Sequence, residues 1–476
     1  MLDPAEAGEE IEGDEDEDVP MESDDEDAPV PLEEIQLQND SIAHFDHHKD
    51  SIFCIAQHPA HPNIVATGGG DDVGYVFDST PLDRPLLPQS YEADPQPKER
   101  ESLPPLYKLE GHTDSINAIT YTFPKGDYLA TAGLDGQLRT WRVSPSGREY
   151  QLLASASEVD EINWLIPCPH PSYPNSLALG ASDGSVWTYT LSDDRASPLT
   201  IVQAFYLHGG ACTAGAWTPD GKLLCTVAED GSFYVWDAFG EAAVAGVAAP
   251  GGGQAVVGLT GQDERFKVDG GLYSVAVSPN GAFAAVGGAE GHIRIVGLPR
   301  IGDAAPVGGA KGGAGAKSKA GGGRQAGGKG AASGSSGAGQ TGQILASLQA
   351  QSDGVETLTF SAPPLTLMAA GSVDGSIALF DTAHRFAVRR HIRGAHEDEA
   401  VIKVDFVTDR PSGGWLLTSC GNDGVVRRWD CRGGTAAAEQ GLAQEWRGHR
   451  GGGEGGGVLG FVQGGCGGRI VTAGDE

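Results

Sequence analysis

The chain has 476 residues, of which 65 are Asp or Glu and 32 are Lys or Arg, so its formal net charge is −33. Such acidity favours a basic partner, and it speaks against direct binding of nucleic acid, whose phosphates would be repelled. No apolar run is long enough to span a membrane, and the seven cysteines show no paired metal-ligand spacing. We therefore expect a cytoplasmic or nuclear protein with reduced cysteines and no membrane contact.

Residues 1–34 form an acidic first segment. The first 48 residues contain 19 Asp and Glu and no Lys or Arg. Like charges at this density repel one another and the segment has little apolar surface to bury, so we expect a disordered tail. Two interpretations of the tail stay open: it solubilises the protein, or it binds or shields a partner.

Residues 35–45, IQLQNDSIAHF, alternate in polarity and predict a strand. A unit that recurs down the chain follows, and its copy in residues 110–143 is complete. There a Gly-His pair precedes a run of alternating polarity. A turn and a second apolar run follow and lead to a hairpin signal at Asp135, and a third run ends around Trp141. Tryptophan–aspartate (WD40) repeats place their signature dipeptide at that point, although its second residue here is Arg142.

The same hairpin recurs near Asp72, Asp183, Asp230, Glu290, Asp374, Asp423 and Asp475. Eight such units of four short strands predict an all-β fold, a WD40 β-propeller of eight blades over residues 35–476. A single four-stranded sheet cannot bury both of its faces, whereas a closed ring stacks each sheet on two neighbours. We expect residues 35–45 to clasp the last blade. Because the eighth unit stops at Glu476, we expect that blade to be incomplete, with an exposed edge.

Three inserts interrupt the repeats, at about residues 79–105, 240–264 and 302–342. Each follows a closing strand and precedes the next opening strand, so all three should emerge on one face of the ring and leave the other face open. Residues 302–342 have the composition of a Gly-rich flexible linker. That insert is either a loop of little function or a weak contact for RNA or for the acidic tail.

The sequence offers poor candidates for catalysis, and we expect no enzyme activity, no cofactor and no metal site. His58 and His61 lie near Cys54, but they stand where other units have turn residues, so we interpret them as parts of a turn. The recurring hairpin Asp residues are expected to be structural. In this repeat type that Asp commonly bonds the His of the Gly-His pair, which here corresponds to His112, His208, His396 and His449.

Acidic residues recur at the start of the innermost strands, around the mouth of the expected central channel. Equivalent or nearly equivalent positions hold Asp50, Asp114, Asp160, Asp353 and Glu399, further carboxylates lie at Glu158, Glu161 and Glu356, and nearby aromatic residues are Phe53, Trp164 and Tyr273. Each Asp alone could simply cap a loop. Together the carboxylates would focus negative potential and accept bidentate hydrogen bonds from arginine, which favours a basic partner.

At these residues the chain resembles the family of angio-associated migratory cell protein and its fungal counterpart, the dedicated chaperone of large-subunit ribosomal protein L-ten. The resemblance covers about residues 40–476 apart from the inserts. It rests on the acidic tail, HKDSIFCIAQHP with TGGGDD, GHTDSINAITYTF with LATAGLDG, SEVDEINWL, and VETLTF with AAGSVDGSIALFD. The chain departs from the family in its Gly-rich insert, in a degenerate fifth unit ending IRIVGL and in the missing last strand.

The resemblance implies a non-enzymatic, monomeric ribosome-assembly chaperone. Such a protein would capture the basic N-terminal segment of newly made L-ten on its acidic face and deliver it to the pre-60S particle. On this interpretation the cationic segment docks at Asp114, Glu158, Asp160, Glu161 and Glu356, with Trp164 as a stacking neighbour.

Two other functions stay open at this point. One is a scaffold or substrate receptor for a signalling or ubiquitin-ligase complex, which would depend on apolar pockets and respond weakly to salt. The other is an acidic histone chaperone, which would share the salt dependence but bind a different client.

Overall fold

The computed structural model describes residues 39–82, 101–247, 255–301, 340–408, 414–433, 441–451, 456–465 and 467–475. These residues belong to one compact unit that extends from Gln38 to Glu476. The predicted acidic tail, residues 1–34, and most of the Gly-rich insert lie outside the described residues.

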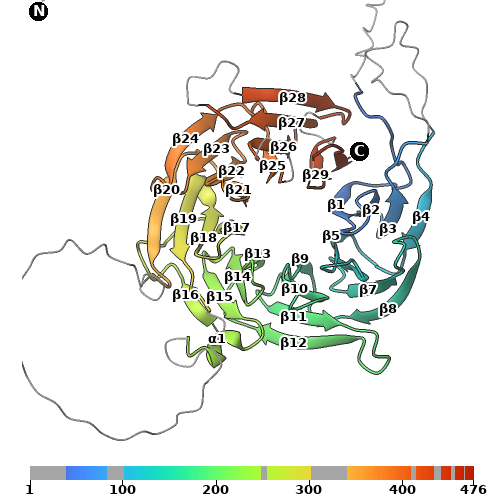
Figure 1. Ribbon diagram of the computed structural model, residues 1–476, viewed down its shortest axis with the longest axis horizontal. Coiled ribbons are helices and arrows are strands. Elements are labelled where there is room, and N and C mark those ends of the chain that lie inside the picture. The colour runs from blue at the N-terminus through green and yellow to red at the C-terminus, as the bar shows by residue number, and fades with distance from the viewer. Residues whose placement is uncertain are drawn as a thin grey trace, which may run out of the picture. The chain divides into compact units, whose positions relative to one another are not determined.

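Antiparallel sheets are arranged around a ring (Figure 1); in the part of the chain that the structure describes, seven are four-stranded and the eighth is two-stranded. From the innermost strand outward, the first four sheets comprise β1 (Ile52–Gln57), β2 (Ile64–Gly69), β3 (Gly74–Asp78) and β4 (Pro105–Leu109); β5 (Ile116–Tyr121), β6 (Tyr128–Gly133), β7 (Leu138–Val143) and β8 (Tyr150–Ala156); β9 (Ile162–Pro167), β10 (Ser176–Ala181), β11 (Val186–Leu191) and β12 (Leu199–Phe205); and β13 (Cys212–Trp217), β14 (Leu223–Ala228), β15 (Phe233–Asp237) and β16 (Ala255–Leu259).

The remaining sheets comprise β17 (Leu272–Val277), β18 (Phe283–Gly288), β19 (His292–Gly297) and β20 (Ile344–Gln349); β21 (Val355–Phe360), β22 (Leu367–Ser372), β23 (Ile377–Asp381) and β24 (Ala387–Ile392); β25 (Val401–Phe406), β26 (Leu416–Gly421), β27 (Val425–Asp430) and β28 (Leu442–Arg447); and β29 (Val458–Val462) with β30 (Val471–Gly474). In the described residues, the short helices α1 (Glu241–Val244) and η2 (Ala289–Gly291) lie between strands. The prediction of an eight-bladed all-β propeller with an incomplete last blade is confirmed.

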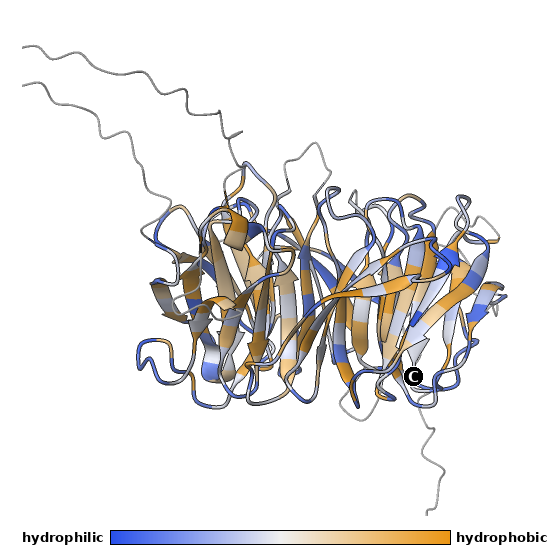
Figure 2. Cartoon of the chain, turned by 90° about the horizontal axis from the view of Figure 1, so that it is seen from below, coloured by the Kyte–Doolittle hydropathy of each residue, from blue (hydrophilic) through white to orange (hydrophobic). Residues whose placement is uncertain are grey.

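The second strand of each blade is the centre of the core. Every residue of β2, β6, β10, β14 and β22 is buried. These strands have a partner on each edge, and neighbouring blades cover both of their faces. Small and apolar residues therefore occupy successive positions and do not alternate with exposed ones. The outermost strands β8 and β12 keep several exposed residues because they form the rim. Figure 2 shows the result, with apolar residues along the strands and hydrophilic residues in the loops at the two faces.

The ring closes between the two-stranded sheet and the first blade. Strand β1 packs against β29 and β30, and the Ser51 hydroxyl donates a hydrogen bond to the Asp475 carboxylate. An apolar cluster in this seam contains Ala43, Phe45, Ile55, Val65, Phe77, Leu103, Val462 and Val471. Residues 39–48, which we call the closing segment, therefore contribute side chains to the joint.

The strand predicted over residues 35–45 is wrong for its described part. Residues 39–45 form no strand, and residues 35–38 lie outside the described residues. Instead, the closing segment is held at Asp40, which hydrogen-bonds Arg447 at the end of β28, and at Phe45, whose ring stacks on Phe77 with 4.2 Å between centroids. The segment joins the seventh blade to the first by local hydrogen bonds and packing rather than by strand pairing.

The inserts connect third strands to outermost strands, as expected. The described strand ends that flank the inserts lie at the opposite end of the ring from the hairpins that join second and third strands. The second insert is shorter than predicted, because β16 lies within residues 240–264. Of the third insert only residues 340–342 are described, immediately before β20. In the described part of the chain no helix has the length and apolar character needed to cross a membrane.

Candidate functional site

All eight innermost strands carry a β-bulge at their second residue. The bulged residues are Phe53, Asn117, Asn163, Thr213, Tyr273, Glu356, Ile402 and Leu459. A bulge leaves one residue without a ladder partner and re-aims its side chain. Every blade begins with its innermost strand and continues outward through antiparallel neighbours, so the residues ahead of the innermost strands lie at one end of the ring, together with the hairpins between second and third strands. We call this end the hairpin face.

Five of the predicted carboxylates occupy equivalent positions on the hairpin face, two residues before an innermost strand begins. They are Asp50, Asp114, Asp160, Asp353 and Glu399. The carboxylates of Asp50, Asp114 and Asp353 accept the backbone N–H of the next residue at 2.8, 2.7 and 2.7 Å. These three residues therefore cap their loops, as the structural interpretation predicted.

Capping does not neutralise these carboxylates. Among the described residues, no ion pair involves any of the five, nor Glu158, Glu161 or Glu356. Glu399 is half-buried and the other seven are exposed. The hairpin face therefore presents uncompensated negative charge to solvent, which attracts cations.

Glu356, Asp353 and Tyr273 gather where the fifth and sixth blades meet. A Cβ atom placed on Gly354 would lie 3.4 Å from Glu356 Oε1 and 3.7 Å from Tyr273 Cδ2, so the carboxylate and the ring flank that glycine. Although Glu356 is exposed, the surrounding protein partly desolvates its carboxylate and so raises its pKa, and the negative charge of Asp353 raises it further. Burial also raises the pKa of Tyr273, with added effects from Glu356, Glu229 and Asp353. A bound cation would relieve this mutual repulsion.

Trp164 is a core residue and not the stacking surface that the sequence predicted. It is 8% exposed. A Cβ atom on either Gly180 or Gly215 would approach its ring to 2.3 Å, so the indole fills the space that these glycines leave between the third and fourth blades. Phe53, by contrast, is 42% exposed and lies beside Asp50 over Gly70. An aromatic surface is present on this face, but a different residue supplies it.

The histidines of the Gly-His pairs are structural. His112 Nδ1 lies 3.0 Å from an Asp135 carboxylate oxygen and its Nε2 lies 2.7 Å from the Thr131 hydroxyl. His396 makes the same pair of contacts, at 2.8 Å to Asp423 and 2.7 Å to the Ser419 hydroxyl. These networks tie the loop ahead of an innermost strand to the hairpin of the same blade.

Two other histidines correct the sequence prediction. His208 contacts the hydroxyls of Ser232 and Thr226, at 2.6 and 2.7 Å, rather than the hairpin Asp. His48 was not predicted, and its Nδ1 lies 3.0 Å from an Asp71 carboxylate oxygen. Its position four residues before Ile52 matches the spacing of His112 and could have identified it. His449 contacts Thr472, 2.8 Å away.

His58 and His61 form a turn. The backbone N–H groups of Ala60 and His61 donate to His58 Nδ1 at 3.1 and 3.2 Å. In the described residues, no group of three or more His, Cys, Asp or Glu side chains is arranged to hold a metal ion.

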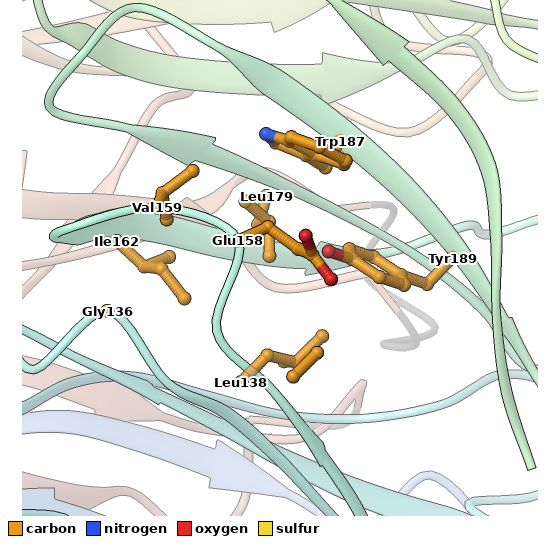
Figure 3. A pocket seen from close by; sticks show the side chains of 9 residues that line it. Gly136, Leu138, Glu158, Val159, Ile162, Leu179, Trp187 and Tyr189 are labelled. Carbon is orange, nitrogen blue, oxygen red and sulfur yellow. The ribbon is translucent and has the colours of Figure 1, made fainter.

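The SEVDEINW unit departs from this histidine pattern. Glu158 stands four residues before Ile162, the place that His112 has before Ile116. It lies where the second and third blades meet, beside Trp187 and Tyr189 of β11 (Figure 3). Asp160 and Glu161 lead directly into β9 at the innermost position. The structure thus separates Glu158 from the two carboxylates that are its neighbours in sequence.

Four segments, residues 39–78, 103–142, 199–237 and 263–296, match the WD40 family model, described as "WD domain, G-beta repeat". The crystal structure of Sqt1 from Chaetomium thermophilum is 51% identical in sequence, with a match that covers 92% of this chain and 96% of that one at a TM-score of 0.76. The chain belongs to the Sqt1 family of WD-repeat proteins.

Other comparisons agree with membership of the Sqt1 family. The C. thermophilum Sqt1 has also been crystallised bound to the N-terminus of the ribosomal protein L10; that structure is 50% identical, at a TM-score of 0.76, over 92% of this chain and 98% of that one. The ribosome assembly protein SQT1 of Saccharomyces cerevisiae is 30% identical over 236 residues, and this match spans about half of either chain, 48%. The human angio-associated migratory cell protein is 23% identical over 411 residues, which cover 86% of this chain and 74% of that protein.

Proposed function

We propose that this protein is a ribosome-assembly chaperone. It binds the basic N-terminal segment of newly made large-subunit ribosomal protein L10 on its hairpin face and delivers that protein to the pre-60S particle. The observation that carries the proposal is the complex of the 50% identical Sqt1 with the L10 N-terminus, taken together with the uncompensated carboxylates of the hairpin face.

The chemistry of that face suits a cationic peptide. Carboxylates from five blades stand at equivalent positions, two residues before an innermost strand. A low-dielectric rim focuses their potential, raises the association rate of a cationic segment and offers acceptors for the planar guanidinium group. A segment destined to bind RNA would be shielded there from other polyanions until it is handed over.

The test is calorimetric titration of the purified protein with an L10 N-terminal peptide in a salt series, beside a histone tail of matched charge. We expect the L10 peptide to bind more tightly and its affinity to fall as salt screens the exposed carboxylates. The double variant Asp160→Lys with Glu161→Lys should lose binding. Asp127→Lys with Glu149→Lys is the matched control, because it makes the same charge change at exposed positions near the opposite face.

Equal and weak binding of both peptides would contradict the proposal. That outcome would show a general attraction of polyanion for polycation, and it would favour the scaffold interpretation. Loss of binding in the Asp127 and Glu149 control would show that total charge, not the hairpin face, governs the interaction.

A further inference from the structure

The third blade lacks the histidine network of its neighbours. In the seventh blade His396 contacts Ser419, and the Trp429 indole N–H donates to the same hydroxyl at 2.8 Å. Ser419 is the fourth residue of its second strand. The equivalent residue in the third blade is Leu179, and the histidine position is Glu158. Leu179 has no hydroxyl group for the Glu158 carboxylate to bond, so Glu158 cannot reproduce the network.

An apolar slot occupies the place of the missing imidazole. It is lined by Gly136, Leu138, Ala156, Glu158, Val159, Ile162, Leu179, Trp187 and Tyr189, and it is too narrow to hold a water molecule. Figure 3 shows the Glu158 side chain across it, between Leu138 and Trp187. Glu158 is exposed, and within the described part of the chain neither a hydrogen bond nor an ion pair engages its carboxylate. The replacement of histidine thus leaves an unneutralised charge over an apolar floor.

Trp187 lines the slot together with Glu158, and the ring of Tyr206 lies against Trp187. Trp187 and Tyr206 meet nearly edge to face, with 5.8 Å between ring centroids and 85° between their planes. The Trp187 indole N–H donates to the Ser185 hydroxyl at 2.9 Å, which holds that ring in place. Tyr206 is 58% exposed. Burial raises the pKa of Tyr189, and the nearby Glu158 and Tyr206 add to this shift.

A carboxylate next to aromatic faces suits one kind of side chain. The guanidinium of arginine is planar, so it can stack on a ring while its N–H groups bond a carboxylate. The ammonium of lysine offers a point charge with no flat face, and it is more strongly hydrated. Apolar side chains would leave the Glu158 charge uncompensated.

We propose that Glu158, Trp187 and Tyr206 form an arginine subsite on the hairpin face, over the outer part of the third blade and apart from the carboxylates at the innermost strands. This inference rests on the proposed function, because its ligand is an arginine of the same basic segment. The subsite would anchor one point of the segment away from the centre of the ring and so fix its direction across the face.

The experiment is a double-mutant cycle measured by calorimetry. Glu158→Gln and Tyr206→Ala are titrated with the L10 N-terminal peptide and with peptides in which each basic side chain is replaced in turn by glutamine. We expect Glu158→Gln to weaken binding about tenfold and Tyr206→Ala about fivefold, since a charge-assisted hydrogen bond is stronger than an exposed cation–π contact. Replacement of the one arginine that binds the subsite should weaken peptide binding to the wild-type protein, but it should have little further effect on binding to either variant.

Glu149→Gln and Leu152→Ala are the matched controls. Both residues are exposed and lie on β8 or just before it, away from the subsite, and both variants should bind as the wild type does. The tested residues are exposed as well, so thermal melting should show all four variants folded.

The outcomes separate the two proposals. If Asp160→Lys with Glu161→Lys abolishes binding while Glu158→Gln and Tyr206→Ala leave it unchanged, the arginine subsite is refuted and the chaperone function stands. Coupling of Glu158 to a lysine of the peptide would also refute the subsite. If the wild-type protein fails to bind the peptide, the proposed function is wrong and the subsite falls with it.

Discussion

Asp40 and Arg447 are joined by two hydrogen bonds, from the Asp40 N–H to the Arg447 carbonyl at 2.7 Å and from the Arg447 N–H to the Asp40 carboxylate at 2.9 Å. They are 407 residues apart in the sequence. This contact attaches the closing segment to the last strand of the seventh blade, beside the two-stranded sheet. The segment then contributes Phe45 to the apolar cluster that this sheet shares with the first blade.

The closing segment should therefore stabilise the ring. We expect Phe45→Ala to lower the free energy of unfolding by about 2–4 kcal/mol, because it removes a stacked ring from an apolar cluster. Ile42→Ala is the control, since Ile42 is 45% exposed in the same segment, and it should cost under about 0.5 kcal/mol. Urea unfolding followed by tryptophan fluorescence measures both. Equal effects would show that the segment does not pack as described.

The histidine networks should contribute to stability rather than to binding. His396→Ala removes the partner of both Asp423 and the Ser419 hydroxyl, and we expect a loss of about 2–4 kcal/mol in the free energy of unfolding. The comparison is His384→Ala, because the His384 side chain is 78% exposed and pairs with Asp381 at the surface. That change should cost under about 1 kcal/mol. A folded His396 variant of wild-type stability would disprove the structural role.

The same networks predict a pH dependence of folding. Burial lowers the pKa of His208 to about 4, whereas the unfolded chain titrates near the ordinary value of 6.5. Between these values the unfolded state binds the proton, so the stability from this group is complete above about pH 6.5 and is lost as the pH falls toward 4. Burial also lowers the pKa of His48, His112 and His396.

We therefore expect the urea midpoint to fall between pH 7.5 and pH 5. Over the whole titration, which ends below pH 4, His208 should lower the free energy of unfolding by roughly 3 kcal/mol. Replacement of His208 by glutamine should remove its share of the pH dependence. A midpoint that stays constant from pH 7.5 to pH 5 would contradict the burial of these neutral imidazoles.

Glu356 should make peptide binding depend on pH. Burial and the charge of Asp353 raise its pKa above the ordinary 4.5, so Glu356 becomes protonated as the pH falls toward that raised value. Its attraction for a cationic segment then disappears. We expect the affinity for the L10 peptide to decrease as the pH falls from 7.5 toward the raised pKa of Glu356, and this decrease to be smaller in Glu356→Gln. Glu149→Gln, near the opposite face, should keep the pH dependence of the wild type.

Much of the fold and part of the site follow from local patterns. The hairpin signals at Asp135 and its equivalents, with alternating runs between them, determined the number of blades and the end of the ring where Asp50 and Asp114 lie. Turn chemistry and side-chain alternation act within a few residues, so they can be read along the chain. Family membership likewise rests on sequence features such as SEVDEINW.

Which side chains contact one another across strands and blades was decided only by the tertiary structure. The alternation around Trp164 does not tell whether its indole points to solvent or into the gap left by Gly180 and Gly215, which belong to other strands. The closing segment alternates like a strand, yet Asp40 and Phe45 find partners in blades at both ends of the chain. Glu158 adjoins Asp160 in sequence but lies beside Trp187 and Tyr189 in space. These contacts depend on the packing of distant strands, which one segment's pattern does not contain.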